Sequence, residues 1–318
     1  MLLSRQRFSS LSEGSPPPAQ AALSISHAVG SSLHRALSDD ALKDEDNAAF
    51  VRCLDPLVRE EWLRRLRWIR LVDRLAENEC LEPAGRRFTR FCRSWQRFVA
   101  TGRTGTQDPY AQMVREIGLC WGASRPRRPT REASPAPARA WEAYMAALSD
   151  YHRPGLVLST LAAHDTMLGR LSGHLFQLIP FLTPATTETI YAFGALDQFM
   201  NNLRDLEEDA SHGICYLPEE VLGAWRIDRE SLLAGRALGQ AGYRRMMSFW
   251  INEHLPALRR CATAFIEMDL PEPSLAIMRG WTLRRHARIE RVLRECDLDF
   301  RAFPARYWTA VRRELPAS

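Results

Sequence analysis

The sequence predicts an all-α protein with a single domain. Apolar residues recur with a period near 3.6 over most of the chain beyond the N-terminal region, and alternating β-branched runs of strand length are nearly absent. The 318 residues, with 46% hydrophobic and 25% charged side chains, suffice for one large core. No repeat of fixed period divides them, so we expect one helical domain from residue 41 to residue 318.

Residues 1–40 predict a disordered tail. They are rich in Ser, Pro and Ala and lack the uninterrupted apolar core of a secretory signal. The longest apolar stretch of the chain, Leu175 to Thr183, is interrupted by Gln177 and Pro180 and is shorter than the roughly 20 residues that span a bilayer. We therefore expect a cytoplasmic protein without a transmembrane helix.

The first long helix is expected to follow Pro56. In the stretch PLVREEWLRRLRWIRLVDRLAENE, a turn of about 100° per residue brings Trp62, Leu66 and Ile69 onto one stripe, with arginines opposite. Two further helices are expected at 85–99 and 109–121. The Pro/Arg/Ser-rich segment near 122–139 has no apolar periodicity and predicts a loop.

Helical periodicity resumes after this loop and continues to the C-terminus. Thr183 and Pro184 make a suitable N-cap and first residue for one of these helices. The expected helices span residues 141–151, 156–179, 184–209, 231–255, 257–267, 274–296 and 302–315.

Charge and cysteine content exclude several classes of protein. The net charge of +5 comes almost entirely from arginine, because Lys43 is the only lysine, and no zinc-finger, RRM or KH fingerprint accompanies it. We therefore expect no nucleic-acid partner, although arginine forks suit phosphates. Seven cysteines without a CxxC pair argue against a zinc site or a disulfide framework.

The segment LDQFMNNLRDLEEDASHGICYLP, residues 196–218, carries an acidic helical face. Residues three or four apart share a face, so Asn201, Asp205 and Asp209 stack together, with Gln198 one turn before them. Two carboxylates and an amide oxygen form a set of ligands that suits Mg²⁺. The alternative is a solvated acidic face paired with Arg204.

A second acidic set lies far upstream, in RLVDRLAEN at residues 70–78. Asp73 and Glu77 are four residues apart, and Arg70 lies one turn before Asp73. A surface face with pairs among Arg70, Arg74 and Glu77 is one explanation. However, the two carboxylates continue the apolar stripe of the helix, where they need a cation or a wet cavity.

Together the two acidic motifs resemble those of the squalene/phytoene synthase family. The family's QxxNxxRDxxED motif stands here as Gln198, Asn201, Arg204, Asp205, Glu208 and Asp209. Its RGxxYLP-like segment is similar to HGICYLP, residues 212–218. Its RxxDDxxD motif is similar to Arg70, Asp73, Arg74 and Glu77.

The resemblance implies a single-domain isoprenoid synthase helical bundle around a central apolar cavity. It further implies Mg²⁺ ligands at Asp73, Glu77, Asn201, Asp205 and Asp209, and contacts to the prenyl diphosphate from Arg70, Gln198 and Tyr216. The catalytic set would be Asp205, Asp209, Asn201 and Arg204. These residues would ionise an allylic prenyl diphosphate and release pyrophosphate, while the apolar wall keeps water from the cation.

Three departures from the family pattern affect what receives the prenyl group. Arg74 replaces the second aspartate of the first motif. The family's HSxSF segment, whose serines help to hold a diphosphate, aligns with EDNAAF at residues 45–50, which has no serine. Met167 stands where the family has a tyrosine. All three fall on features that a reaction of two diphosphates needs. We therefore expect a divergent member that uses one diphosphate and a second small-molecule acceptor.

The first interpretation is prenyl transfer to a non-isoprenoid acceptor, plausibly aromatic and for example carbazole-like. The alternative is head-to-head synthesis of a phytoene- or squalene-like product. A third reading, from a different class, is a non-catalytic relative that serves as a partner subunit. The sequence predicts neither the prenyl chain length nor the oligomeric state.

Other side chains are candidates for supporting roles. His164 or His174 could take a proton from the acceptor, although an isolated histidine is more often structural. Aromatic residues could shield a carbocation or simply fill the core, namely Phe176, Phe181, Tyr191 and Phe193. The arginine-dense face of residues 278–295 suits contact with a membrane surface, and a solvated helix face explains it equally well.

Overall fold

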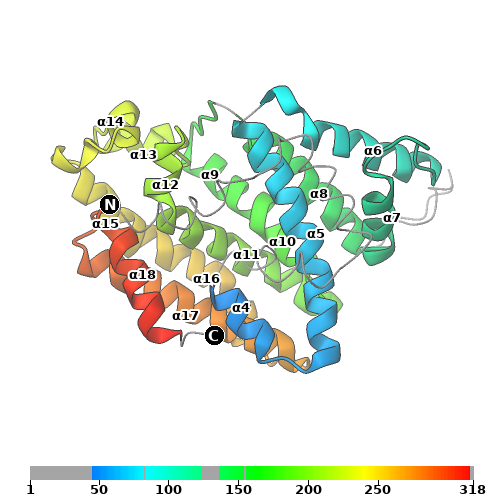
Figure 1. Ribbon diagram of the computed structural model, residues 1–318. Helices are drawn as coiled ribbons and strands as arrows, with labels where there is room; N and C mark the ends of the chain where they lie inside the picture. Colours follow the sequence, from blue (N-terminus) through cyan, green and yellow to red (C-terminus); the bar gives the residue numbers. More distant parts are fainter. Residues whose placement is uncertain (1–44, 82, 123–135, 154, 316–318) are drawn as a thin grey trace.

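The fold consists of helices packed around one core, as Figure 1 shows for the computed structural model. The structure describes residues 45–81, 83–122, 136–153 and 155–315, and these contain no strand. The all-α prediction is therefore confirmed. The principal helices are α4 (Glu45–Arg52), α5 (Pro56–Leu81), α6 (Arg87–Thr101), α7 (Ala111–Cys120), α8 (Ala136–Tyr151), α9 (Leu161–Leu168), α10 (His174–Phe176), α11 (Pro184–Arg204), α12 (Leu206–Ser211), α13 (Glu219–Ala224), α14 (Arg229–Leu233), α15 (Tyr243–Phe249), α16 (Leu255–Glu267), α17 (Pro273–Glu295) and α18 (Phe303–Glu314).

Helix α5 crosses the front of the molecule in Figure 1 and forms one wall of the interior. It begins at Pro56, whose fixed φ suits the first helical position. The Asp55 carboxylate caps it by accepting a hydrogen bond from the backbone N–H of Leu57 at 3.0 Å. The expected apolar stripe is present, with Trp62 and Ile69 each 1% exposed.

Helix α11 runs through the middle of the fold. Thr183 caps it with a reciprocal capping box to Thr186, and Pro184 is its first residue, as predicted. The expected continuous helix to Asp209 is interrupted at Asp205, where φ is −94° and ψ is 4°. The backbone N–H of Asp209 still bonds to the Asp205 carbonyl at 2.8 Å, so the two carboxylates remain one turn apart.

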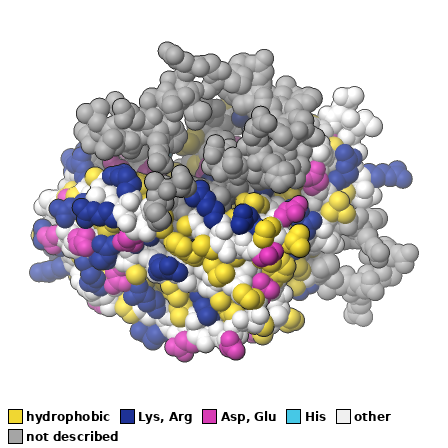
Figure 2. Space-filling model, turned by 60° about the horizontal axis from the view of Figure 1, so that its bottom comes forward, with side chains coloured by type: hydrophobic (Ala, Val, Ile, Leu, Met, Phe, Trp, Pro, Cys, Tyr) yellow, Lys and Arg dark blue, Asp and Glu magenta, His cyan; other side chains and the backbone are white. Residues whose placement is uncertain are grey.

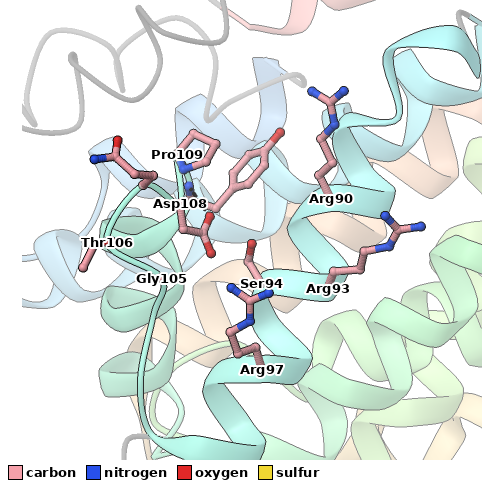
Figure 3. Close-up of a pocket in the computed structure, with 10 residues that line it drawn as sticks. Arg90, Arg93, Ser94, Arg97, Gly105, Thr106, Asp108 and Pro109 are labelled. Atoms are coloured by element: carbon pink, nitrogen blue, oxygen red, sulfur yellow. Dashed lines mark hydrogen bonds between the residues drawn. The ribbon is translucent and has the colours of Figure 1, made fainter.

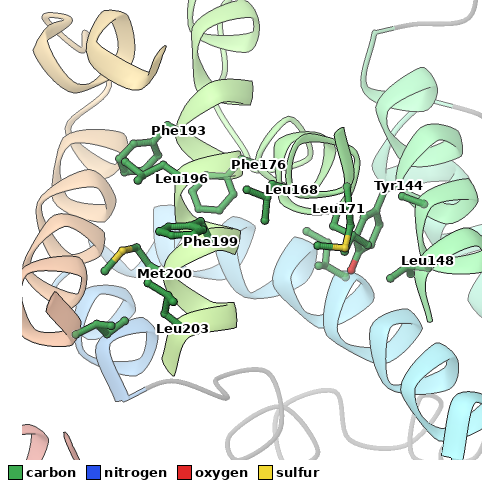
Figure 4. Packing of buried hydrophobic residues seen from close by; sticks show 14 of the residues in the cluster. Tyr144, Leu148, Leu168, Leu171, Phe176, Phe193, Leu196, Phe199, Met200 and Leu203 are labelled. Carbon is green, nitrogen blue, oxygen red and sulfur yellow. The ribbon is translucent and has the colours of Figure 1, made fainter. Parts of the chain in front are cut away.

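The segment beside α11 contains a π-helical turn, η2 (Gly169–Gly173), between α9 and α10. Gly194 of α11 lies so close to this turn that an added Cβ would be 2.3 Å from the Ser172 carbonyl oxygen. The absence of a side chain at Gly194 therefore lets the two backbones touch. Figure 4 shows the apolar layer that surrounds this contact, including Leu171 and Phe193.

Several expected boundaries differ from those observed. The helix expected from 156 starts only at Leu161, because Thr160 caps it by accepting from the Ala163 N–H at 3.1 Å. The segment expected as one helix at 231–255 is divided into α14, α15 and two short turns, η3 (Ala237–Gly239) and η4 (Trp250–His254).

The remaining differences concern the loop and two short helices. Helix α8 starts at Ala136, inside the expected loop near 122–139, and most of that loop lies outside the described residues, as does the expected tail at 1–40. Helices α4 and α13 were not predicted, because each is too short to show a clear period.

The arginine-dense face of α17 is engaged by neighbouring helices. Arg288 and Arg291 both pair with Glu314 of α18, and Arg294 pairs with Glu290. The face turned forward in Figure 2 accordingly mixes basic, acidic and apolar side chains. None of the described helices is both long and apolar enough to cross a membrane.

Candidate functional site

A cavity of about 220 Å³ lies between α5, α8, α10, α11 and α17. One part of its wall is apolar, and charged side chains line the rest of the same cavity. The apolar lining comes from Phe50, Trp62, Leu66, Ile69, Leu148, Leu171, Leu175, Phe176, Ile179 and Met278.

The cavity brings together all nine site residues that the sequence predicts. Those from α5 are Arg70, Asp73 and Glu77, and those from α11 and beyond are Gln198, Asn201, Arg204, Asp205, Asp209 and Tyr216. The two acidic motifs, separated by more than a hundred residues in the chain, thus share one cavity. Arg74, the residue that departs from the first motif, is not part of its lining.

The first acidic set is held by an ion pair and a tyrosine. Arg70 pairs with Asp73, and both side chains are less than one-fifth exposed. The hydroxyl of Tyr144 on α8 lies 3.4 Å from the other Asp73 oxygen. Burial, followed by the Asp73 charge, raises the pKa of Tyr144 well above its usual value. Tyr144 therefore stays protonated and can donate to this carboxylate.

The second acidic set carries a two-point ion pair. Arg204 donates from Nε and Nη2 to the two oxygens of Asp205, both at 2.7 Å. The side chain of Arg204 is 9% exposed and that of Asp205 is 26% exposed. A guanidinium is thus fixed beside a carboxylate at the wall of the cavity.

Tyr216 faces the carboxylates from the segment that follows α12. Burial is the main cause that raises its pKa, and the charges of Asp209, Glu77 and Asp73 raise it further. Both acidic sets therefore act on this one hydroxyl. It remains an O–H donor at neutral pH.

An amide relay fixes the orientation of α11 side chains in the cavity. Ser172 donates its hydroxyl hydrogen to Gln198 Oε1, and Gln198 Nε2 donates to Asn202 Oδ1 at 2.8 Å. The neighbouring Asn201 donates from Nδ2 to Asp197 Oδ2 at 3.3 Å. Asn201 Oδ1 is buried and has no hydrogen-bond partner among the described residues.

Asp197 forms a buried charge cluster one turn deeper than Asn201. Its Oδ1 lies 2.6 Å from Arg285 Nη2 and 2.7 Å from His286 Nε2. Burial raises the pKa of Asp197, but the Arg285 charge and the His286 hydrogen bond outweigh burial and hold that pKa below its usual value. Burial lowers the pKa of His286, so this histidine is neutral and donates its Nε2–H.

The donor set fits Mg²⁺ by its chemistry. Carboxylate and amide oxygens are the protein ligands that this ion prefers, and the orphaned Asn201 Oδ1 is a buried oxygen that needs a partner. The one group of His, Cys, Asp and Glu ligands that converge within 4.8 Å in the described residues lies elsewhere, at His164, Asp165 and His254. Its two imidazoles suit other metals better.

A second hollow, of about 460 Å³, lies between α6 and the loop before α7. Figure 3 shows Arg90, Arg93 and Arg97 beside Asp108 in this hollow. It is larger than the first cavity but contains no residue of either acidic motif. We therefore place the candidate site in the cavity between α5 and α11.

Most of the expected supporting residues lie outside the cavity lining. His164 is fully buried between Phe199 and Trp250, and His174 packs against Tyr191, so neither can reach an acceptor in the cavity. Of the four aromatic candidates, Phe176 alone lines the cavity; Phe193 and Tyr191 are packing residues, and Phe181 is 41% exposed. Met167 is fully buried and does not line it.

Sequence reasoning missed several residues that line the cavity. Tyr144 and His152 extend the face of Leu148 by one turn on either side, a helical spacing that could have shown them together. Asp197 and Asn202 lie four residues from motif residues on α11. Thr282 and Arg285 of α17 carry no sequence signal that connects them with either motif.

Comparisons with known proteins point to the same family that the two acidic motifs resemble. The family model described as squalene/phytoene synthase matches residues 165–311. Phytoene synthase 1 of Arabidopsis thaliana is 27% identical over 139 residues, 42% of this chain and 31% of that protein. Phytoene synthase 1 of Solanum lycopersicum is 43% identical over 56 residues, 16% of this chain and 14% of that protein. The chain thus matches less than a third of the length of these curated relatives.

The fold comparison extends over more of the chain. The crystal structure of squalene synthase HpnC from Alicyclobacillus acidocaldarius superposes with a TM-score of 0.56, covering 90% of this chain and 97% of the other. The sequence identity is 12%, so this similarity concerns the fold.

Proposed function

We propose that the chain belongs to the squalene/phytoene synthase family, whose model matches residues 165–311, and that it is a Mg²⁺-dependent prenyltransferase. The observation that carries the proposal is the meeting of both acidic motifs in one cavity with an apolar wall. The substrate is an allylic prenyl diphosphate. The prenyl group passes to a non-isoprenoid, aromatic acceptor, and pyrophosphate is released.

Ionisation of the diphosphate is the first step. The bond between prenyl C1 and oxygen breaks, and its electron pair leaves with pyrophosphate. Bound Mg²⁺, held by Asn201, Asp205 and Asp209 with Asp73 and Glu77 opposite, would supply positive charge to the leaving group. The guanidiniums of Arg70 and Arg204 are fixed by their carboxylates and can donate to its oxygens.

Capture of the cation completes the transfer. A ring carbon of the acceptor forms a bond to prenyl C1, and that ring carbon then loses its proton. His152 lines the cavity and its Nδ1 is buried without a hydrogen-bond partner among the described residues, so it is the histidine placed to take the proton. The apolar side chains around the cavity exclude water, which would otherwise quench the cation.

The alternative function is head-to-head coupling of two prenyl diphosphates to a phytoene- or squalene-type product, which the names of the relatives favour. The departures at Arg74, at residues 45–50 and at Met167 support the first function, because they fall on features that a reaction of two diphosphates needs.

The decisive experiment incubates the full-length protein with Mg²⁺ and dimethylallyl, geranyl, farnesyl or geranylgeranyl diphosphate, with and without aromatic acceptors. Pyrophosphate and organic products are measured together. We expect product formation that depends strictly on the acceptor. A long-chain hydrocarbon formed without acceptor would instead establish the alternative.

A pair of variants tests the assigned diphosphate face. Asp205→Asn with Asp209→Asn should lower pyrophosphate release by at least about 100-fold, the scale of losing an electrostatic contact to the transition state. Glu207→Gln is the matched control, because Glu207 lies on the same short helix and is exposed. Unchanged turnover in the double variant would contradict the site, and binding without turnover in the unmodified protein would indicate a non-catalytic role.

A further inference from the structure

The side of the cavity formed by α11 and α17 is polar. Asp197, Asn202, Thr282 and Arg285 all line it, and none is more than 8% exposed. Burying charges and amides beside a hydrocarbon chain is unfavourable unless each finds a polar partner. A wall that contacted only prenyl chains would not need these four polar side chains. We call the four residues together the polar wall.

Two hydrogen-bond donors of this wall have no good acceptor. Asn202 Nδ2 is buried and has no hydrogen-bond partner among the described residues. The hydroxyl of Thr282 reaches only the Met278 sulfur, at 3.5 Å, and a thioether is a weak acceptor. Buried polar groups in proteins are nearly always satisfied, so these donors point to a ligand that brings acceptor atoms.

The orientation of Asn202 is fixed by the amide relay. Its Oδ1 is already used by Gln198 Nε2, whose own oxygen accepts from Ser172. While Gln198 Oε1 accepts from Ser172, reversing the Asn202 amide would bring two N–H groups together, so in this arrangement Asn202 Nδ2 is the end that remains for a ligand. The atom of Asn201 without a partner is its oxygen, which suits a metal ion, whereas the atom of Asn202 without a partner is its nitrogen, which donates hydrogen bonds.

The polar wall begins beside the acidic set and extends away from it. Asn202 directly follows Asn201, whereas Asp197 precedes Asp205 by two turns of α11, which is about 12 Å along the helix axis. A molecule held by this wall would therefore lie next to the diphosphate, where prenyl C1 becomes exposed as pyrophosphate leaves. This is the location that an acceptor must occupy.

We propose that the polar wall is the acceptor subsite and that the acceptor is an aromatic ring bearing an oxygen that accepts hydrogen bonds. Asn202 and Thr282 donate to this oxygen, beside the ion pair of Arg285 and Asp197. The two hydrogen bonds hold the ring by its oxygen substituent and so orient it toward the cation. The inference rests on the proposed prenyl transfer and specifies its second substrate.

The test compares 1-naphthol with 1-methylnaphthalene, two probes of nearly equal shape that differ in the oxygen. Binding to the full-length protein is measured by quenching of tryptophan fluorescence and by calorimetry. We expect 1-naphthol to bind about tenfold more tightly, the scale of a hydrogen bond or two to buried donors. In Asn202→Leu and in Thr282→Val the preference should fall below about threefold.

Thr309→Val is the matched control, because Thr309 lies on an outer helix, where its hydroxyl donates to the Ala305 carbonyl and accepts from Arg312. The KM for the prenyl diphosphate should stay unchanged in Thr282→Val, because the Thr282 hydroxyl bonds to Met278 and not to a residue of the acidic motifs. Circular dichroism checks that each variant is folded. Because the two variants are measured separately, the test still works if one of them does not fold.

The outcomes separate the inference from the proposed function. Equal binding of the two probes by the unmodified protein, or an unchanged preference in both variants, overturns the acceptor subsite and leaves a wall solvated by water. If turnover still depends on an aromatic acceptor in that case, the proposed function stands. If no acceptor supports turnover while the oxygen preference is present, the prenyl transfer fails and the subsite remains.

Discussion

Asn201 donates its side-chain N–H to Asp197 at 3.3 Å, so an amide on the acidic face of α11 is oriented by a buried carboxylate one helical turn before it. The amide nitrogen is occupied, and the oxygen is left for the cavity. The buried cluster of Asp197, Arg285 and His286 thus supports the acidic motif structurally as well as lining the cavity.

The first prediction concerns the stability of this cluster. Asp197→Leu should lower the free energy of unfolding by about 3–5 kcal/mol, because it leaves the Arg285 charge buried without its carboxylate. Asp197→Leu with Arg285→Met should recover much of that loss, since the pair is then replaced by apolar groups. Urea denaturation of both single variants and the double variant gives the coupling energy. Additive effects would show that the pair is not coupled.

The second prediction concerns the altered first motif. Arg74 does not line the cavity, whereas Asp73 does, so their substitution should have unequal effects. Arg74→Ala should change kcat/KM for pyrophosphate release by less than about threefold, and Asp73→Ala should lower it by at least about 100-fold. Steady-state kinetics at saturating Mg²⁺ measures both. A loss of similar size in Arg74→Ala would mean that this arginine contacts the diphosphate.

The third prediction assigns the proton acceptor. His152→Phe should lower the amount of prenylated product per pyrophosphate released by at least about tenfold, because a positioned base contributes roughly 10²–10⁴ to proton transfer. Release of pyrophosphate itself should persist. His174→Phe is the control, since His174 lies outside the cavity lining. Product yield and pyrophosphate are quantified in the same reaction, and equal ratios in the two variants would exclude His152.

The fourth prediction concerns pH. Burial lowers the pKa of both His164 and His286 in the folded protein, so the unfolded chain binds more protons between the lowered values and about 6.5. Stability should therefore be full above pH 6.5 and fall as the pH decreases. Thermal unfolding from pH 8 to pH 5 tests this trend.

Two variants locate the origin of that pH dependence. His164→Gln should flatten the slope of Tm against pH, because the titrating group is gone. His212→Gln should retain the slope, since His212 is exposed. If the slope in His164→Gln equals that of the unmodified protein, His164 is not among the groups that titrate.

Much of the candidate site could be predicted from the sequence because its residues repeat at helical spacing. Asn201, Asp205 and Asp209 share a face for geometric reasons alone, and the fixed offsets of the motif identified the face as functional. The break at Asp205 could not be predicted, since it changes two backbone angles without moving the carboxylates off their face.

The residues that were missed depend on contacts between distant segments. Arg285 is buried only because Asp197, 88 positions earlier in the chain, lies opposite it. His164 was considered as a proton acceptor, with a structural role as the more frequent case, and its packing against Phe199 and Trp250 is structural. Periodicity within one helix gives no information about which other helix it faces.

The contact between Gly194 and the Ser172 carbonyl has an engineering consequence. Ser172 and Gln198 lie on opposite sides of this contact, and both contribute to the cavity. A single methyl group at position 194 would force the two backbones apart and pull the Ser172 hydroxyl away from Gln198. A position that no ligand touches thus controls the orientation of two amides that face the cavity, and a library that varies the wall should leave Gly194 unchanged.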